Sequence, residues 1–200
     1  MERELASVGW RASFFEAVAP RESAGFQSKG AHGCYLSHLG TLKAARDCDR
    51  LIVLEDDLNF CQDFKSHWQA ALQSLPDDWS IFYPGPGYNR LQINDRGIVR
   101  LLPQSELQGA HFMVFTGWVL ARIIDGLETV KNRSPMPVDG AYNAIRAQNP
   151  DLAAYAHFPP LGYQRSSRSD IAGRQWFDVG IAQPIVSALR RIKSEINRAG

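Results

Sequence analysis

Apolar and polar positions divide the chain into alternating helices and strands. In the segment 33–48, apolar residues recur at spacings of three and four, among leucines and alanines that favour helix. Short apolar runs that are closed by proline, glycine or charged residues are typical of strands. Helices are therefore predicted over 2–8, 33–48, 64–75, 118–130 and 137–148, and strands over 13–18, 51–54, 79–83, 98–102, 111–115 and 151–157.

The order of these elements predicts an α/β fold. Strands that alternate with helices usually form a mainly parallel sheet flanked by helices. The unbroken apolar run 51–54 predicts a strand that is buried on both faces, as in a parallel sheet. The polar, glycine-containing segment 21–30 is predicted as a loop. No linker is visible, so residues 1–183 are predicted to form a single domain.

The segment 184–200 has the pattern of an amphipathic helix. Apolar residues recur there at spacings of four, three and four, and basic side chains lie away from the apolar stripe. Two interpretations stay open. The helix can pack on the body of the protein with its charges in water, or it can make a peripheral contact with an anionic inner membrane face.

Composition narrows the class of protein. The net charge of +1 gives no sign of nucleic-acid binding, so no nucleic-acid partner is expected. No apolar run is long enough to cross a bilayer, and residues 1–5 are too charged for a secretory signal. The three cysteines are odd in number and match no zinc-binding spacing, which predicts reduced thiols and a cytoplasmic location.

Three consecutive carboxylates, Glu55, Asp56 and Asp57, follow the strand 51–54 directly. Ligands of open α/β sheets bind outside the carboxyl ends of the strands. Adjacent carboxylates repel one another, and a hard divalent cation such as Mg²⁺ or Mn²⁺ relieves that repulsion. Such an ion could neutralise a diphosphate leaving group. The alternative is a solvated loop whose acids cap the next helix.

Several ordered motifs resemble glycosyltransferase family 25, which includes bacterial lipopolysaccharide galactosyltransferases and collagen galactosyltransferases. Residues 30–38 read Gly-Ala-His-Gly-Cys-Tyr-Leu-Ser-His, and residues 53–57 read Val-Leu-Glu-Asp-Asp. Downstream, the segments 109–111 and 137–139 and the pair Gln164 with 169–171 also resemble family elements. The resemblance extends from about Leu5 to about Ile171.

This resemblance implies a GT-A-like fold, a UDP-hexose donor such as UDP-galactose, a glycan or lipooligosaccharide acceptor, and inversion at the anomeric carbon. It implies Mn²⁺ or Mg²⁺ at Asp57 and Asp56. The implied site residues are Gly30, Gly33, Ser37, His38, Glu55 and Asp56 for the donor, Gln164 and Ser169 for the acceptor, and Asp139 or, as a second choice, Asp170 as the catalytic base.

Family members begin with a strand that precedes the helix predicted here over 2–8. The sequence does not include this strand, so the domain is expected to be truncated at its N-terminus relative to the family. An incomplete donor site makes a non-catalytic glycan- or partner-binding protein of the same fold the alternative function. A metal-dependent phosphohydrolase is a third interpretation, although it needs more widely spaced ligands than this sequence offers.

Individual residues also allow structural interpretations. Asp139 can stabilise the start of its helix instead of accepting a proton. Cys34 lies one helical turn before His38, so the pair could form a reactive thiolate, but a small buried side chain is the favoured interpretation for this cysteine. His111 can touch the donor or a metal, or it can be a structural group at the start of a strand.

Overall fold

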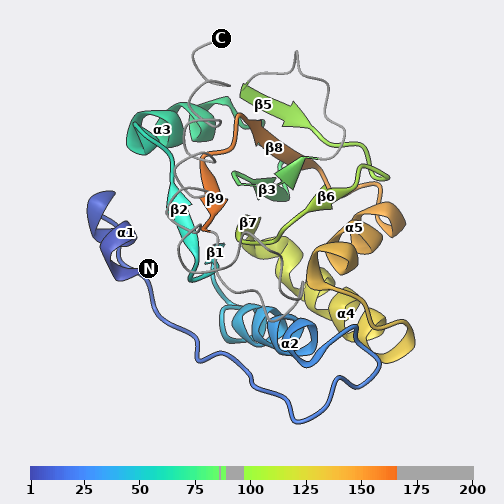
Figure 1. Ribbon diagram of the computed structural model, residues 1–200. Helices are drawn as coiled ribbons and strands as arrows, with labels where there is room; N and C mark the ends of the chain where they lie inside the picture. Colours follow the sequence, from blue (N-terminus) through green and yellow to red (C-terminus); the bar gives the residue numbers. More distant parts are fainter. Residues whose placement is uncertain (86, 89–96, 166–200) are drawn as a thin grey trace.

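The computed structural model describes residues 1–85, 87–88 and 97–165, and its centre is a five-stranded mixed sheet (Figure 1). The strand order in this sheet is β1-β7-β3-β8-β5. Its strands are β1 (Arg50–Leu54), β3 (Ile81–Tyr83), β5 (Gly97–Arg100), β7 (Phe112–Thr116) and β8 (Ala154–Phe158). Two small ribbons pair β2 (Leu58–Phe60) with β9 (Gly162–Gln164), and β4 (Gly87–Tyr88) with β6 (Leu107–Gln108).

Helices cover both faces of the sheet (Figure 1). They are α1 (Glu2–Ser7), α2 (Lys29–Ala44), α3 (Phe64–Ser74), α4 (Gly117–Arg133) and α5 (Val138–Gln148). Alternate side chains of β7 enter two different cores. Met113 and Phe115 pack with α2, α4 and α5, whereas Phe112 and Val114 pack with α1, α3 and β2. The molecule therefore has three layers, with the sheet in the middle.

The α/β class is confirmed, but the prediction of a mainly parallel sheet is wrong. Strand β7 runs antiparallel to both of its neighbours, β1 and β3, and β5 runs antiparallel to β8. Within the five-stranded sheet only β3 and β8 are parallel. The alternation of helices and strands along the sequence does not encode the direction in which each strand is inserted, which explains the error.

Strand β1 lies at one edge of the five-stranded sheet. The side chain of Ile52 is 37% exposed, and of the five residues only Val53 is buried. The prediction of a strand buried on both faces is therefore wrong. An edge strand of an antiparallel pair needs only one covered face, and a short apolar run alone does not distinguish the two cases.

Helix α2 begins at Lys29, four residues before its predicted start, so the predicted loop 21–30 is wrong at its end. The Ser28 side chain accepts a hydrogen bond from the Ala31 N–H at 3.0 Å and caps the helix. The other four predicted helices agree with the structure to within a few residues at each end.

The strand predicted over 13–18 is wrong. This segment is extended but pairs with no strand among the described residues, and it crosses α2 instead (Figure 1). The Val18 N–H donates to the Ser37 Oγ at 2.9 Å. A Cβ atom on Gly33 would lie 2.5 Å from the Val18 oxygen, and one on Gly40 would lie 2.4 Å from the Phe15 ring. Glycine at both positions therefore lets the segment approach the helix.

Two predictions fall outside the described residues, namely the helix over 184–200 and the site positions Ser169 and Asp170. Within the described ranges, no helix has the length and apolar character needed to cross a membrane.

Candidate functional site

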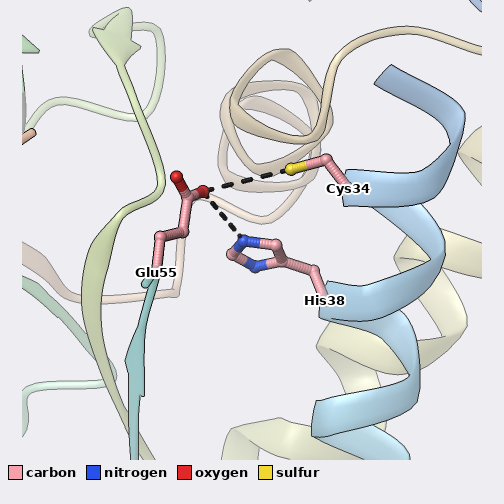
Figure 2. A group of neighbouring side chains, drawn as sticks. All are labelled: Cys34, His38 and Glu55. Atoms are coloured by element: carbon pink, nitrogen blue, oxygen red, sulfur yellow. Dashed lines mark hydrogen bonds and ion pairs between the residues drawn. The ribbon is translucent and has the colours of Figure 1, made fainter. Parts of the chain in front are cut away.

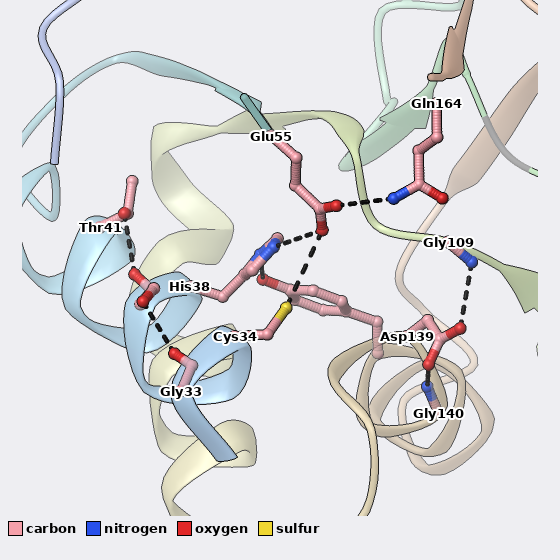
Figure 3. A network of polar contacts seen from close by, with 11 residues as sticks. Gly33, Cys34, His38, Thr41, Glu55, Gly109, Asp139, Gly140 and Gln164 are labelled. Carbon is pink, nitrogen blue, oxygen red and sulfur yellow. Dashed lines mark hydrogen bonds and ion pairs between the residues drawn. The ribbon is translucent and has the colours of Figure 1, made fainter. Parts of the chain in front are cut away.

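Glu55 is the centre of a polar cluster where β1 ends (Figure 3). Its N–H donates to the His111 oxygen at 3.0 Å, which continues the β1–β7 pairing by one residue. On the side chain, His38 Nε2 lies 3.2 Å from Oε1, and Gln164 Nε2 donates to Oε2 at 3.0 Å. Both carboxylate oxygens are thus engaged by residues distant in the sequence.

His38 and Cys34 reach Glu55 from the same face of α2 (Figure 2). The Cys34 Sγ lies 4.0 Å from Glu55 Oε1. His38 is buried, and its Nδ1 lies 3.2 Å from the Tyr142 hydroxyl on α5. An ionised Glu55 can only accept, so the Nε2–H donates to it, and the Tyr142 hydroxyl can either donate to Nδ1 of a neutral ring or accept from the Nδ1–H of a charged one.

The electrostatic environment keeps Glu55 ionised. Burial acts to raise its pKa, but the hydrogen bond and charge of His38, the charge of His111 and the hydrogen bond from Gln164 outweigh burial, so the pKa is lowered. Burial, together with the charges of Glu55, Asp139 and Asp57, raises the pKa of the Cys34 thiol to about 12. A free thiolate that acts as a nucleophile is therefore not favoured at Cys34.

The pKa of Asp57 is raised, whereas the pKa of Glu55 is lowered. Burial raises the pKa of Asp57 to about 6, with further increases from the charges of Glu55 and Asp56 and opposing contributions from Arg165 and Gln164. Its Oδ1 is buried and has no hydrogen-bond partner among the described residues. A carboxylate oxygen in this state is well suited to bind a cation, because the cation would supply the missing contact and favour ionisation of the carboxyl group.

Asp56 is exposed, and its backbone oxygen accepts from Arg165 Nη2 at 2.7 Å. The interpretation of Asp56 and Asp57 as caps of the next helix is wrong. Strand β2 follows them directly, and α3 begins only after Asp63.

His111 is buried beside this cluster, immediately before β7, the strand that pairs with β1. Neither of its ring nitrogens has a hydrogen-bond partner within the described part of the chain. Burial lowers its pKa, while the charge of Glu55 and the backbone of Gly162 act in the opposite direction. Cβ atoms on Gly85 and Gly109 would lie 3.2 Å and 2.8 Å from its ring nitrogens, so two glycines make room for the ring.

Asp139 lies near the start of α5 and accepts two backbone hydrogen bonds. The Gly109 N–H donates to its Oδ2 at 3.0 Å, and the Gly140 N–H donates to its Oδ1 at 2.8 Å (Figure 3). These bonds hold the turn before β7 against α5. The role of Asp139 as catalytic base stays a prediction.

The remaining predicted donor residues lie elsewhere on α2. Gly33 and Ser37 contact the segment around Val18, as described above, and Ser37 Oγ also donates to the Gly33 oxygen at 2.7 Å. Gly30 lies in the first turn of α2, one turn before Cys34. The described contacts of Gly33 and Ser37 are structural, and a part for these three residues in donor binding stays a prediction.

The sequence interpretation missed Tyr142 and underrated Cys34. Tyr142 lies one turn after Asp139 on α5, and that spacing indicates only that the two share a face of the helix, not that Tyr142 contacts His38. The i, i+4 relation of Cys34 to His38 predicts that the two side chains share a face of α2. The approach of Glu55 depends on the tertiary packing of β1 on α2, which no local pattern reveals.

Comparison with known proteins supports the resemblance seen in the motifs. Residues 11–104 match the family described as Glycosyltransferase family 25 (LPS biosynthesis protein). Over these residues the chain is similar to family 25 glycosyltransferases. The matched segment includes α2, Cys34, His38 and the Glu55–Asp57 carboxylates, so the predicted resemblance is confirmed.

Three curated relatives are similar to the matched segment and the residues around it. Procollagen galactosyltransferase 1-B of Xenopus laevis is 28% identical over 145 residues, which is 66% of this chain and 22% of the relative. Procollagen galactosyltransferase 1 of Danio rerio is 27% identical over 146 residues, and Inactive glycosyltransferase 25 family member 3 of Homo sapiens is 26% identical over 147 residues; each match covers 66% of this chain and 23% of the relative. The chain thus spans less than a quarter of the length of these relatives.

Proposed function

We propose that this chain is a glycosyltransferase that moves a hexose, galactose in the first instance, from a UDP-hexose donor to a glycan or lipooligosaccharide acceptor. The family 25 match and the galactosyltransferase names of two relatives support the reaction class. The observation that carries the proposal is the position of Glu55, Asp56 and Asp57 at the end of β1, where His38 and Gln164 converge on Glu55. The cytoplasmic location and the GT-A-like fold belong to this proposal.

Asp57 and Asp56 would hold the divalent cation, Mn²⁺ or Mg²⁺. The buried Oδ1 of Asp57, which has no hydrogen-bond partner within the described ranges, fits such an ion. When bound, the cation neutralises the diphosphate leaving group. His38 and Gln164 hold the Glu55 carboxylate in one orientation, so that it and Asp56 can contact the ribose or the sugar of the donor.

Transfer with inversion needs a base on the side of the acceptor hydroxyl, opposite the leaving group. Asp139 is the candidate among the described residues, and Asp170 is the second choice. The hydrogen bonds from Gly109 and Gly140 fix the Asp139 carboxylate in place. Gln164 and Ser169 would complete the acceptor side.

A transfer and UDP-sugar hydrolysis assay with Mn²⁺ tests the proposal on wild type and Asp57→Asn. Losing a metal ligand should lower kcat/KM at least about 100-fold, since the cation contributes several kcal/mol of charge stabilisation. Asp78→Asn is the matched control. Asp78 is exposed and precedes β3, which runs parallel to β1, so it lies at the opposite end of the sheet. Equal activity in Asp57→Asn and wild type would refute the metal role.

The second candidate is a non-catalytic protein of the same fold that binds a glycan or a protein partner. Two observations favour it. One relative carries the word inactive in its name, and both oxygens of Asp139 already accept backbone hydrogen bonds. Calorimetry with UDP and Mn²⁺ separates the candidates, because a protein with an incomplete donor site should show no metal-dependent binding of UDP.

A further inference from the structure

Cys34, His38 and Glu55 form a second cluster with metal-ligand chemistry, which shares Glu55 with the carboxylate run but does not include Asp56 or Asp57 (Figure 2). One ligand atom from each of the three residues lies within 4.8 Å of the other two. The side chains come from two elements, since α2 supplies the thiol and the imidazole, and the end of β1 supplies the carboxylate. We propose that these three residues bind a Zn²⁺ ion and leave one coordination position open.

The spacing of the ligand atoms fits a tetrahedral ion. Bonds of about 2.0–2.3 Å to nitrogen, oxygen and sulfur place neighbouring ligand atoms roughly 3.3–3.8 Å apart in a tetrahedron. His38 Nε2 lies 3.2 Å from Glu55 Oε1, and Cys34 Sγ lies 4.0 Å from the same oxygen. The third pair, Cys34 Sγ and His38 Nε2, lies within 4.8 Å. Side-chain rotations that move a ligand atom by up to about 1 Å therefore bring the three atoms to tetrahedral spacing.

The surrounding contacts orient the ligand atoms toward one point. Gln164 donates to Glu55 Oε2, so that Oε1 is the oxygen that faces His38 and Cys34. Tyr142 lies against His38 Nδ1 and leaves Nε2 on the side of Glu55. A hydroxyl can accept as well as donate, so it can accept from Nδ1–H once Nε2 binds an ion. Outer contacts of this kind are typical of metal-binding histidines and carboxylates.

The ligand set decides which ion is bound. Thiolate and imidazole ligands favour Zn²⁺, whereas Mg²⁺ and Mn²⁺ prefer oxygen. As zinc binds, the Cys34 thiol releases its proton to solvent, and the zinc–sulfur bond replaces the S–H bond. Three protein ligands with one open position are typical of zinc sites that bind a water molecule or a substrate oxygen. This assignment gives Glu55 Oε1 to zinc and leaves Asp56 and Asp57 for the hard cation. It does not rest on the proposed function, because zinc binding is measured without any sugar or nucleotide.

The test uses the full chain, purified with reductant, stripped with a chelator and desalted. Elemental analysis after titration with Zn²⁺ should find one zinc per chain. Titration with Co²⁺ as a spectroscopic probe should give a thiolate-to-cobalt charge-transfer band in the near ultraviolet. Cys34→Ser should lose that band and bind Zn²⁺ at least about tenfold more weakly, while Cys48→Ser, which changes an exposed cysteine, should behave as wild type.

Tyr142→Phe tests the outer contact and should weaken zinc affinity by about 10–100-fold while leaving the cobalt–thiolate band in place. Near-ultraviolet circular dichroism establishes that each variant is folded. Less than stoichiometric zinc in the wild type, or the same cobalt band in a folded Cys34→Ser variant, would overturn the proposal. Asp57→Asn should retain zinc while losing Mn²⁺-dependent UDP binding, so a failure of either proposal is recognised separately.

Discussion

Two neighbouring carboxylates acquire different properties from their contacts. Glu55 accepts from His38 and Gln164, and its pKa is lowered in spite of burial. Asp57, two residues later, has a raised pKa and an oxygen that finds no hydrogen-bond partner in the described part of the chain. Glu55 therefore has its charge stabilised by the protein itself, whereas the charge of Asp57 gains more from an added cation.

Asp57→Asn should change the pH dependence of stability in chelator. The pKa of Asp57 is raised from 3.8 to about 6 in the folded protein, so its contribution is present below about pH 4 and is lost as the pH rises through 6. At pH 8 the variant should be more stable than wild type by about 1–2 kcal/mol, a value reduced from the full shift because the side chain is partly exposed. Urea unfolding from pH 4 to pH 8 measures this difference.

The exposed variant Asp78→Asn provides the control and should stay within about 0.5 kcal/mol of wild type at every pH. Parallel pH profiles for Asp57→Asn and wild type would show that Asp57 is not destabilised by burial.

At the residue scale, the sequence predicted identities better than contacts. The motifs pointed to His38, Glu55 and Gln164, and the structure brings these three residues into hydrogen-bond contact. The contact of Tyr142 with His38 spans 104 positions of sequence, so no local spacing could assign it. Cys34 was not recognised as a metal ligand, because zinc-binding spacings count cysteines and histidines and do not include a carboxylate from another element.

At the element scale, one face of α2 is adapted to the extended segment that crosses it. Gly33, Ser37 and Gly40 recur at spacings of four and three, and Ser37 Oγ accepts from the Val18 N–H. The face with Gly33 and Gly40 requires the absence of a side chain. The face with Cys34 and His38 requires side chains that reach Glu55. The two functions of α2 are therefore divided between two of its faces.

Gly33→Ala should destabilise the protein, although alanine is the better helix former. The new Cβ would lie 2.5 Å from the Val18 oxygen and 3.1 Å from Pro20 Cδ. We expect a net loss of about 1–2 kcal/mol, because displacing the crossing segment outweighs the helix-propensity gain of about 1 kcal/mol. Urea unfolding measures the loss, and proteolysis should cut the segment 11–20 faster in the variant.

Gly140→Ala in α5 is the matched control for this substitution. A Cβ there would meet only Met136 at ordinary contact distances of 3.5 Å and beyond. This variant should be as stable as wild type or more stable by up to about 1 kcal/mol. A stabilising effect of the same size for both alanines would mean that the segment does not press on α2.

The sequence predicted the type of an element correctly where the hydrophobic pattern was long. The prediction failed where contacts with other segments of the chain determine the local structure. The periodic helices over 64–75, 118–130 and 137–148 are confirmed. The segment 13–18 is a short, mostly apolar run closed by Pro20, as in a strand, but its described side-chain partner is a helix. Strands β2, β4, β6 and β9 were not predicted, because two or three residues carry too little periodicity to be recognised.

At the scale of the whole molecule, α5 joins the candidate site to the sheet. Tyr142 and Asp139 face the site, while the buried Arg146 lies one turn further along the helix. The Arg146 guanidinium donates to the backbone oxygens of Leu102 and Ser105 and to Asn143 Oδ1. It also lies 5.5 Å from the centroid of the Tyr83 ring on β3. Arg146 thus holds α5 against the chain between β5 and β6.

Arg146→Met should destabilise the protein by about 2–4 kcal/mol, because it removes the charge-assisted hydrogen bonds of a buried guanidinium to the part-buried backbone oxygens of Leu102 and Ser105. Arg122→Met on α4 is the control, since Arg122 is exposed and makes a surface ion pair with Asp151 that contributes less than about 1 kcal/mol. Urea unfolding compares the two. If Arg146 positions α5, its loss should also weaken zinc binding in the folded variant, since Tyr142 would no longer be held against His38. Equal losses of stability in the Arg146→Met and Arg122→Met variants would contradict this role. The hydrophobic contacts of α5 alone would then position the helix at the candidate site.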